Sequence, residues 1–159
     1  MKVVDFLSSD AIIPALASAT KGGVLAEMAS FLCAQLTPSH GQGAIDPKAL
    51  CRVLEERELL ASTAIGDGIA IPHGKVDTIE RLVGVLGRSV PGLAFDSIDG
   101  KPTHLVFMLV APSNSAGVHL KALARLSRLF RDASFRQRLL EAPDGATMYR
   151  TIAEEDGKY

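Results

Sequence analysis

The sequence contains no hydrophobic run long enough to cross a membrane. Its longest apolar stretch, residues 105–112, is far shorter than the roughly 20 residues that a membrane-spanning helix needs. The N-terminal residues MKVVDFLSSD also lack the basic start and the apolar stretch of a secretory signal peptide. We therefore expect a cytoplasmic protein that does not insert into a membrane.

Cysteine is scarce in the sequence, and neither sign of charge dominates. Cys33 and Cys51 fall in helical patterns without the spacing of metal ligands, so we interpret both as reduced core residues. The 17 Lys and Arg residues are balanced by 18 Asp and Glu residues, which leaves a net charge of -1. This balance argues against bulk electrostatic binding to nucleic acid.

Hydrophobic periodicity predicts five helices and three strands among the 159 residues. The stretch TPSHGQG ends the first helix, and Asp46 followed by Pro47 is typical of the N-cap and first turn of the second. The expected helices span residues 22–36, 47–60, 117–131, 134–141 and 145–154, and the expected strands span residues 65–71, 82–86 and 104–110. The last strand is almost entirely apolar, as expected for a strand covered on both faces. This order predicts an α/β sandwich in which helices flank a central mixed β-sheet, with no linker that divides it.

The stretch GIAIPHGK, residues 68–75, superficially suggests a nucleotide-binding loop. Five residues separate Gly68 from Gly74, one more than a Walker A loop allows, and Val76 stands where Ser or Thr is required. The sequence also contains no G-x-S-x-G nucleophile elbow and no H-E-x-x-H zinc motif. The familiar nucleotide-binding and hydrolase motifs are therefore absent.

Histidines offer two alternative kinds of site. A metal site could combine Asp67 with the histidines, although no two of them have short ligand spacing; these are His40, His73, His104 and His119. Alternatively, a histidine can act as a nucleophile, because its ring nitrogen is unprotonated near neutral pH.

His73 is the candidate nucleophile. Pro72 fixes its own φ before the histidine, and Gly74 permits unusual backbone geometry after it. Rigid support on one side and a permissive residue on the other suit a presented nucleophile. A surface-loop histidine is the alternative, and the local sequence leaves the two open.

The predicted helix 117–131 carries a second histidine and a basic face. His119 falls on the apolar face in the first turn, where it is either a hydrogen-bonded core residue or part of an anion site. Together with Arg57 at the end of an earlier helix, it could supply donors to a phosphoryl group. The opposite face is either solvated or a docking surface for an acidic partner; it carries Lys121, Arg125, Arg128 and Arg131.

Four ordered segments resemble one known family. They are RELLASTAIGDGIAIPHGK (57–75), FDSIDGKP (95–102), LVAP (109–112) and HLKALARLSRLFRD (119–132). These segments resemble the fructose/mannitol-type, or type 2, EIIA domains of the bacterial phosphotransferase system. The resemblance spans residues 5–153, which implies a single domain. The wording GDGIAIPHGK is most similar to the standalone nitrogen-regulatory members.

The resemblance implies a role for each candidate residue. His73 matches the histidine that is phosphorylated on Nε2 by HPr or a nitrogen-branch counterpart, so the protein would be a phosphotransferase component with a phosphohistidine intermediate. Arg57 matches the arginine beside that histidine, and His119 matches the second histidine, which helps to hold the phosphoryl group. No metal or other cofactor is implied.

The resemblance also implies partners. Nitrogen-regulatory members act on target proteins such as potassium transport and sensor systems, whereas sugar-specific members pass the phosphoryl group to an EIIB domain. A metal-dependent hydrolase is the third hypothesis. One departure from the family pattern is Ala64, which replaces the usual glycine and would be strained if the position required a positive φ.

Overall fold

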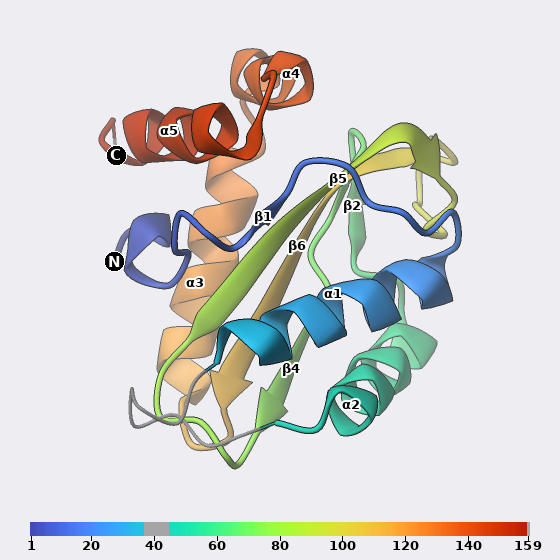
Figure 1. Ribbon diagram of the computed structural model, residues 1–159, viewed down its shortest axis with the longest axis vertical. Helices are drawn as coiled ribbons and strands as arrows, with labels where there is room; N and C mark the ends of the chain where they lie inside the picture. The colour runs from blue at the N-terminus through green and yellow to red at the C-terminus, as the bar shows by residue number, and fades with distance from the viewer. Residues whose placement is uncertain (37–44, 159) are drawn as a thin grey trace.

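A mixed β-sheet forms the centre of the computed structural model, which describes residues 1–36 and 45–158 (Figure 1). The strands are β1 (Ile12–Ile13), β2 (Ala64–Gly66), β3 (Ile69–Ala70), β4 (His73–Val76), β5 (Val83–Leu93) and β6 (Thr103–Pro112). Their order is β1-β5-β6-β3-β2, and β4 pairs with the same edge of β6 as β3 does. Strand β5 runs antiparallel to β6, whereas β3 and β4 run parallel to it. The predicted mixed sheet is confirmed.

Helices cover both faces of this sheet. They are the short 3-10 helix η1 (Val3–Asp5) and the α-helices α1 (Lys21–Gln35), α2 (Pro47–Leu60), α3 (Ala116–Leu129), α4 (Ala133–Glu141) and α5 (Gly145–Asp156). Helices α1 and α2 lie side by side in front of the sheet in Figure 1, and α3 lies behind it. The predicted sandwich of a sheet between helices is therefore confirmed.

All five predicted helices are present, with ends within two residues of those expected. The Asp46 side chain accepts a hydrogen bond from the N–H of Ala49 at 3.3 Å, and Pro47 begins α2, as predicted from the sequence. The stretch TPSHGQG, which was expected to end the first helix, lies outside the described residues.

The prediction of one strand over residues 65–71 is wrong, because the chain reverses within it. Strands β2 and β3 form an antiparallel hairpin, and Asp67 and Gly68 have φ values of 56° and 80°. Two consecutive positive φ values are typical of the tight turns that join hairpin strands, and the Asp-Gly pair favours such a turn. The carbonyl of Gly68 then accepts the N–H groups of His104 and Leu105, which attaches the hairpin to β6.

Two other strands are longer than predicted, and two short ones were not predicted. Strand β5 continues to Leu93 instead of ending at Leu86, because Gly87, Arg88 and, after a register shift, Leu93 also pair with β6. Strands β1 and β4 have too few residues for a periodic pattern. Each is held by parallel pairing with a strand far away in the sequence.

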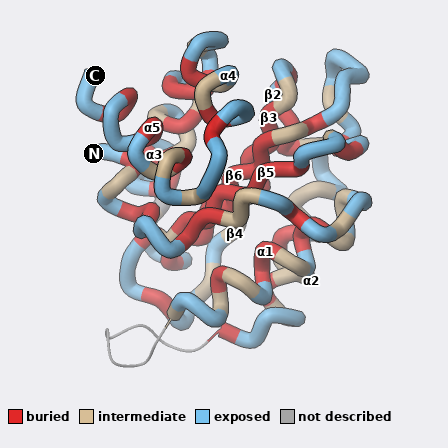
Figure 2. Tube along the Cα trace, turned by 45° about the horizontal axis from the view of Figure 1, so that its top comes forward, coloured by how far each residue is buried: buried red, intermediate tan, exposed pale blue. Residues whose placement is uncertain are grey.

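The core lies along the two long central strands, which are mostly buried in Figure 2. Every residue of β6 except His104 is buried, so the prediction of a strand covered on both faces is confirmed. Cys33 and Cys51 are half-buried free thiols that pack against the core rather than within it. Burial is the main cause that raises the pKa of each thiol to about 11, so both are protonated near neutral pH.

Candidate active site

His73 is the first residue of β4, and its ring orientation is fixed by a short local hydrogen bond. The ring nitrogen Nδ1 lies 2.8 Å from the carbonyl oxygen of Ile71. A carbonyl can only accept, so Nδ1 carries the proton and Nε2 keeps an unshared electron pair. The half-buried side chain and its strand position show that the surface-loop alternative is wrong.

Pro72 and Gly74 hold the backbone on either side of His73. The Pro72 carbonyl accepts the N–H of Leu109 at 2.9 Å, and Gly74 is paired with Val110. The interpretation that Gly74 supplies unusual backbone freedom is wrong, since its φ is not positive. Space explains the glycine instead, because an added Cβ would lie 2.8 Å from Cγ1 of Val53. Gly74 therefore allows α2 to pack closely on β4.

His119 lies beside His73, although the two residues are far apart in the sequence. The ring centroids are 5.2 Å apart, with an angle of 52° between the ring planes. The His119 side chain comes from the first turn of α3 and is only 6% exposed. Its Nδ1 atom is buried and has no hydrogen-bond partner among the described residues. The alternative of a core histidine with satisfied ring nitrogens is therefore wrong for Nδ1.

Burial and nearby positive charge keep His119 neutral. Burial has the largest effect and lowers the pKa of His119 to about 4, with further lowering by the charges of His73 and Lys75. Side chains alternate along a strand, so His73 and Lys75 project from the same face of β4, opposite the Gly74 face that packs on α2. Both therefore point towards α3.

Arg57 lies in the last turn of α2 and is held at the helix end. Its Nη1 atom donates to the carbonyl of Ala61 at 2.9 Å, which fixes one edge of the guanidinium group. Its positive charge lowers the pKa of His73, which indicates that it lies near that ring. The structure thus brings His73 and His119 into contact, and places Arg57 where its charge acts on the His73 ring.

Four influences act on the His73 ring. Burial is the largest and lowers the pKa of His73 below its ordinary value of 6.5. The hydrogen bond to Ile71 raises the pKa, the Arg57 charge lowers it and the Glu58 charge raises it. Because the pKa is lowered overall, the ring is mostly unprotonated at neutral pH, and Nε2 is available as a nucleophile.

A histidine metal centre does not form within residues 1–36 and 45–158. No group of three or more His, Cys, Asp or Glu side chains in these ranges could hold a metal ion. Nδ1 of His104 lies 3.0 Å from the Ser89 carbonyl, and Asp67 lies in the hairpin turn. His40 lies outside the described residues. In the same described ranges, no helix is long and apolar enough to cross a membrane.

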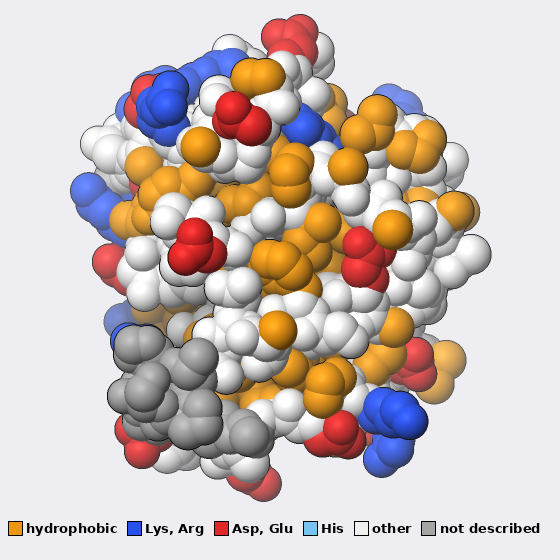
Figure 3. Space-filling model, viewed as in Figure 1, with side chains coloured by type: hydrophobic (Ala, Val, Ile, Leu, Met, Phe, Trp, Pro, Cys, Tyr) orange, Lys and Arg blue, Asp and Glu red, His pale blue; other side chains and the backbone are white. Residues whose placement is uncertain are grey.

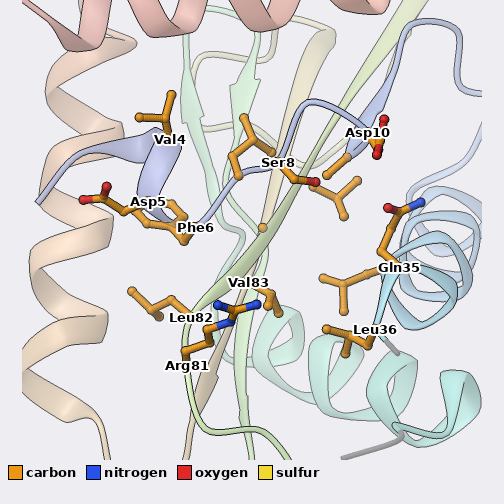
Figure 4. Close-up of a pocket in the computed structure, with 15 residues that line it drawn as sticks. Val4, Asp5, Phe6, Ser8, Asp10, Gln35, Leu36, Arg81, Leu82 and Val83 are labelled. Carbon is orange, nitrogen blue, oxygen red and sulfur yellow. The ribbon is translucent and has the colours of Figure 1, made fainter. Parts of the chain in front are cut away.

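A cavity of about 340 Å³ lies elsewhere, between the N-terminal segment, the end of α1 and the start of β5 (Figure 4). Asp10, Gln35 and Arg81 are among its lining residues, which include no histidine. The cavity and the histidine site are thus separate features. On the face shown in Figure 3, acidic and basic side chains are both scattered among hydrophobic ones.

Comparison with known proteins identifies the family. The profile of the family described as "Phosphoenolpyruvate-dependent sugar phosphotransferase system, EIIA 2" matches residues 5–155. A nitrogen regulatory protein of Bradyrhizobium diazoefficiens is 40% identical over 153 residues, which cover 96% of this chain and 95% of that protein. The chain belongs to the EIIA type 2 family.

Relatives of this EIIA chain include both regulatory and sugar-specific proteins. The fructose-specific EIIABC component of Bacillus subtilis is 35% identical over 156 residues, which cover 98% of this chain but 24% of that larger protein. The crystal structure of the nitrogen regulatory protein IIA-Ntr from Neisseria meningitidis matches with a TM-score of 0.85 and 27% identity, covering 94% of this chain and 98% of that one. The resemblance to type 2 EIIA domains is confirmed.

The departure at Ala64 does not strain this EIIA chain. Ala64 lies in β2 opposite Ala70, and the non-glycine residues with positive φ in the described ranges are Asp67 and Asp96. The hairpin takes its positive φ values from Gly66, Asp67 and Gly68 instead. An alanine methyl group is therefore compatible with the backbone at this position.

The structure also refines the predicted basic face and adds residues to the site. Arg125 is not simply solvated, because its Nη2 atom lies 2.7 Å from Oδ1 of the buried Asp156. Sequence reasoning missed Lys75 and Glu58, which act electrostatically on the two histidines. Lys75 lies two residues after His73, so it would share the side of His73 in an extended chain, and this spacing could have signalled its role. Nothing in the sequence signals a role for Glu58.

Proposed function

We propose that this EIIA protein accepts a phosphoryl group on Nε2 of His73 from a phosphorylated HPr-like carrier of the nitrogen branch. One observation carries the proposal: the Nδ1–H group of His73 is engaged by Ile71, which leaves Nε2 as the free electron-pair donor. The lowered pKa of His73 supports it, since an unprotonated ring is required for attack. The protein would act in the cytoplasm without a metal or other cofactor.

The transfer step follows from the arrangement of the three side chains. Nε2 of His73 attacks the phosphorus in line and forms a new N–P bond, while the donor's N–P bond breaks and its electron pair returns to the donor's ring. Charge spreads over the equatorial phosphoryl oxygens in such a step, so nearby donors and cations stabilise it. Arg57 is suited to this role because its planar fork matches phosphate oxygens. The His119 ring lies beside His73 and would donate a hydrogen bond to a phosphoryl oxygen.

Exposed apolar residues close in sequence to Arg57 and His119 support docking of a protein donor. Leu59 and Leu60 follow Arg57 at the end of α2 and are 86% and 83% exposed. Leu120 follows His119 on α3 and is also exposed. Large apolar side chains that are left in water next to a reactive group favour a protein partner, since docking would bury them.

The deciding experiment is mass spectrometry after incubation with phosphoenolpyruvate, enzyme I and the carrier. We expect one acid-labile phosphoryl group on wild-type protein, located at His73, and none on His73→Ala. The matched control is His104→Ala, which should be labelled like the wild type. Full labelling of the His73→Ala variant would show that the assignment is wrong.

We further propose that the phosphorylation state controls which proteins bind, with potassium transport and sensor systems as candidate targets. The similarity to a nitrogen regulatory protein over almost the whole chain supports this regulatory role. Added phosphate charge can create or disrupt a docking surface. Capture experiments with His73→Ala and His73→Asp variants test it, and equal capture of each target by both would count against a phosphorylation-dependent switch.

A second candidate function is transfer to a separate EIIB domain. The 35% identity to a fructose-specific EIIABC component supports it. The test is to mix the phosphorylated protein with a fructose-type EIIB and to follow the label. Rapid movement of the label to EIIB would favour the sugar-specific role, whereas a label that stays on His73 would favour the regulatory one.

A further inference from the structure

Two charged residues lie at helix ends that disfavour their charge. Lys21 is the first residue of α1, and Glu58 lies in the last turn of α2. A helix N-terminus favours negative charge and a C-terminus favours positive charge, so each residue opposes the dipole of its own helix. They nevertheless pair across the two helices, with 2.7 Å between Nζ of Lys21 and Oε2 of Glu58. An ion pair placed against two helix dipoles suggests a role that helix stability does not explain.

The Glu58 carboxylate holds the turn that follows α2. Both of its oxygens lie 3.2 Å from the N–H nitrogen of Thr63, and its Oε1 atom also accepts the Thr63 hydroxyl. The Glu58 side chain is only 5% exposed, so these bonds replace water almost completely. The neighbouring Arg57 donates to Ala61 in the same turn. Glu58 and Arg57 thus hold the same turn, residues 61–63, which we call the Thr63 turn.

From Thr63 a continuous hydrogen-bond path leads to the phosphoryl acceptor. The Thr63 carbonyl accepts the N–H of Ile71 at 3.0 Å, and the Ile71 carbonyl accepts the Nδ1–H of His73 at 2.8 Å. Thr63 and Ile71 are both buried, so water does not readily replace either bond. The orientation of the Ile71 carbonyl, which selects the His73 tautomer, therefore depends on the position of Thr63.

We propose that the Lys21–Glu58 ion pair is a positioning device for His73: it fixes the Thr63 turn, orients the Ile71 carbonyl and so keeps the lone pair of His73 on Nε2. This inference rests on the proposed phosphoryl transfer for its functional consequence, but not for its structural one. Neither Lys21 nor Glu58 touches the reacting atoms. The proposed positioning acts through the path that ends at Ile71, in addition to the direct effect of the Glu58 charge on the pKa of His73.

Two further contacts of Lys21 connect the ion pair to Phe95 and Asp96, in the segment after β5. The Lys21 ammonium group lies 3.3 Å from Oδ2 of Asp96 and 4.8 Å from the centre of the Phe95 ring. The carbonyl of Phe95 in turn accepts the hydroxyl of Ser62 at 2.7 Å. The Thr63 turn is therefore held from two directions. A purely structural pair would affect only stability, so the test needs a measurement of the His73 ring itself.

The experiment compares Glu58→Gln, Lys21→Met and a control, Glu154→Gln, by NMR of the nitrogen-15-labelled imidazole rings of unphosphorylated protein at pH 8. Glutamine keeps the size of Glu58 but removes the charge that holds Lys21 and Thr63. In wild-type protein we expect His73 to be protonated on Nδ1. In Glu58→Gln we expect the tautomer ratio to shift about fivefold towards protonated Nε2, as expected when one hydrogen bond is weakened. Lys21→Met should show a smaller shift in the same direction.

Phosphoryl transfer is then measured on the same proteins. We expect the rate to fall about tenfold in Glu58→Gln, because a displaced nucleophile loses its alignment. Glu154→Gln breaks an ion pair with Arg138 on the distant α4–α5 surface and should change neither the ring tautomer nor the rate. Lys21→Arg, which retains the charge, should restore most of what Lys21→Met loses.

The outcomes separate this inference from the proposed function. If the wild type is phosphorylated on His73 but folded Glu58→Gln keeps the wild-type tautomer and rate, the positioning role is wrong and the proposed function stands. If the wild type is not phosphorylated but the tautomer still shifts, the positioning role stands and the proposed function fails. If Glu58→Gln does not fold, Lys21→Met decides the matter, and an unchanged tautomer in that variant overturns the inference.

Discussion

His73 and His104 begin from the same local arrangement but have different surroundings. Both rings are half-buried, and each places Nδ1 near a backbone carbonyl, that of Ile71 at 2.8 Å and that of Ser89 at 3.0 Å. The hydrogen bond fixes the tautomer in each case and presents Nε2 as an electron-pair donor. On this criterion alone, the two histidines are equivalent.

The two rings differ in the groups that lie next to them. At His104 the backbone of Gly92 approaches so closely that an added Cβ would lie 2.9 Å from Nε2. At His73 the ring faces His119, and it experiences the charge of Arg57. A fixed tautomer therefore does not by itself distinguish the proposed phosphoryl acceptor from His104. The neighbouring His119 ring and the Arg57 charge distinguish His73, whereas a close backbone distinguishes His104, and each difference can be tested separately.

The largest effect is expected from removing the second ring of the site. His119→Gln should lower the rate of phosphoryl transfer to His73 about a hundredfold, as when one preorganised donor is lost from a charge-stabilising site. His104→Gln should leave the rate within about twofold of the wild type, since it removes no group that acts on the reacting atoms. Transfer of label from the phosphorylated carrier measures both, and similar slowing in the two variants would contradict the distinction between the histidines.

Crowding the glycine beside each histidine should sharpen the comparison. Gly74→Ala brings a methyl group against Val53 and should cost about 1–3 kcal/mol of unfolding free energy. It should also slow transfer, because it moves β4. Gly92→Ala meets the His104 ring at a φ of 82° and should lower stability without slowing transfer. Denaturant unfolding and transfer assays measure the two effects.

A second substitution tests whether the contact with Val53 causes the effect of Gly74→Ala. Val53→Ala removes the atom that an added Cβ would meet, so the double variant should regain part of the lost stability and rate. If Gly74→Ala alone transfers at the wild-type rate, the close approach of α2 to β4 does not position His73.

Acid should destabilise the protein in part through His119. The pKa of its ring is about 4 in the folded protein and near 6.5 when exposed, so the unfolded state binds the extra proton between these values. This contribution to stability is fully present above pH 6.5 and is lost as the pH falls towards 4. Denaturant unfolding between pH 4 and 7 should therefore show a shallower pH dependence for His119→Gln than for the wild type. Identical slopes would contradict burial of a neutral ring.

The smallest effect is expected from Lys75→Met. The Lys75 charge lowers the pKa of His119, so its removal should raise that pKa, although burial should still keep it below 6.5. NMR titration of the ring measures the shift. The pKa of His119 should not change in Lys48→Met, which changes an exposed residue in the first turn of α2.

The helices were predictable from sequence because the information that forms them is local. Asp46 and Pro47 mark the start of α2, and apolar spacing gives the extent of α1 and α3. The short strands were not predictable in this way, since β1 and β4 owe their pairing to distant partners. The hairpin was missed because one strand is expected over residues 65–71, whereas Asp67 and Gly68 form a turn within that range.

The candidate site shows the same division between local and distant information. His73 could be found from its neighbours, but those neighbours suggested the wrong reason for Gly74, because Val53 approaches from another element. The family resemblance led to Arg57 and His119, whose proximity no spacing rule provides. The hydrogen-bond path from Glu58 to His73 could not be predicted from the sequence, since it depends on backbone carbonyls that carry no sequence signal.

The order of strands in the sheet also has a consequence for how the protein is synthesised. His73 pairs with Leu109 of β6, and parallel pairing of this kind closes a long loop before it gains any contacts. A growing chain that has only just passed His73 therefore lacks the strand on which that residue rests, and α3, which provides His119, is made later still. We expect the proposed phosphoryl acceptor to be among the last parts to order, so that an incomplete chain would not carry out the proposed exchange of phosphoryl groups with the carrier.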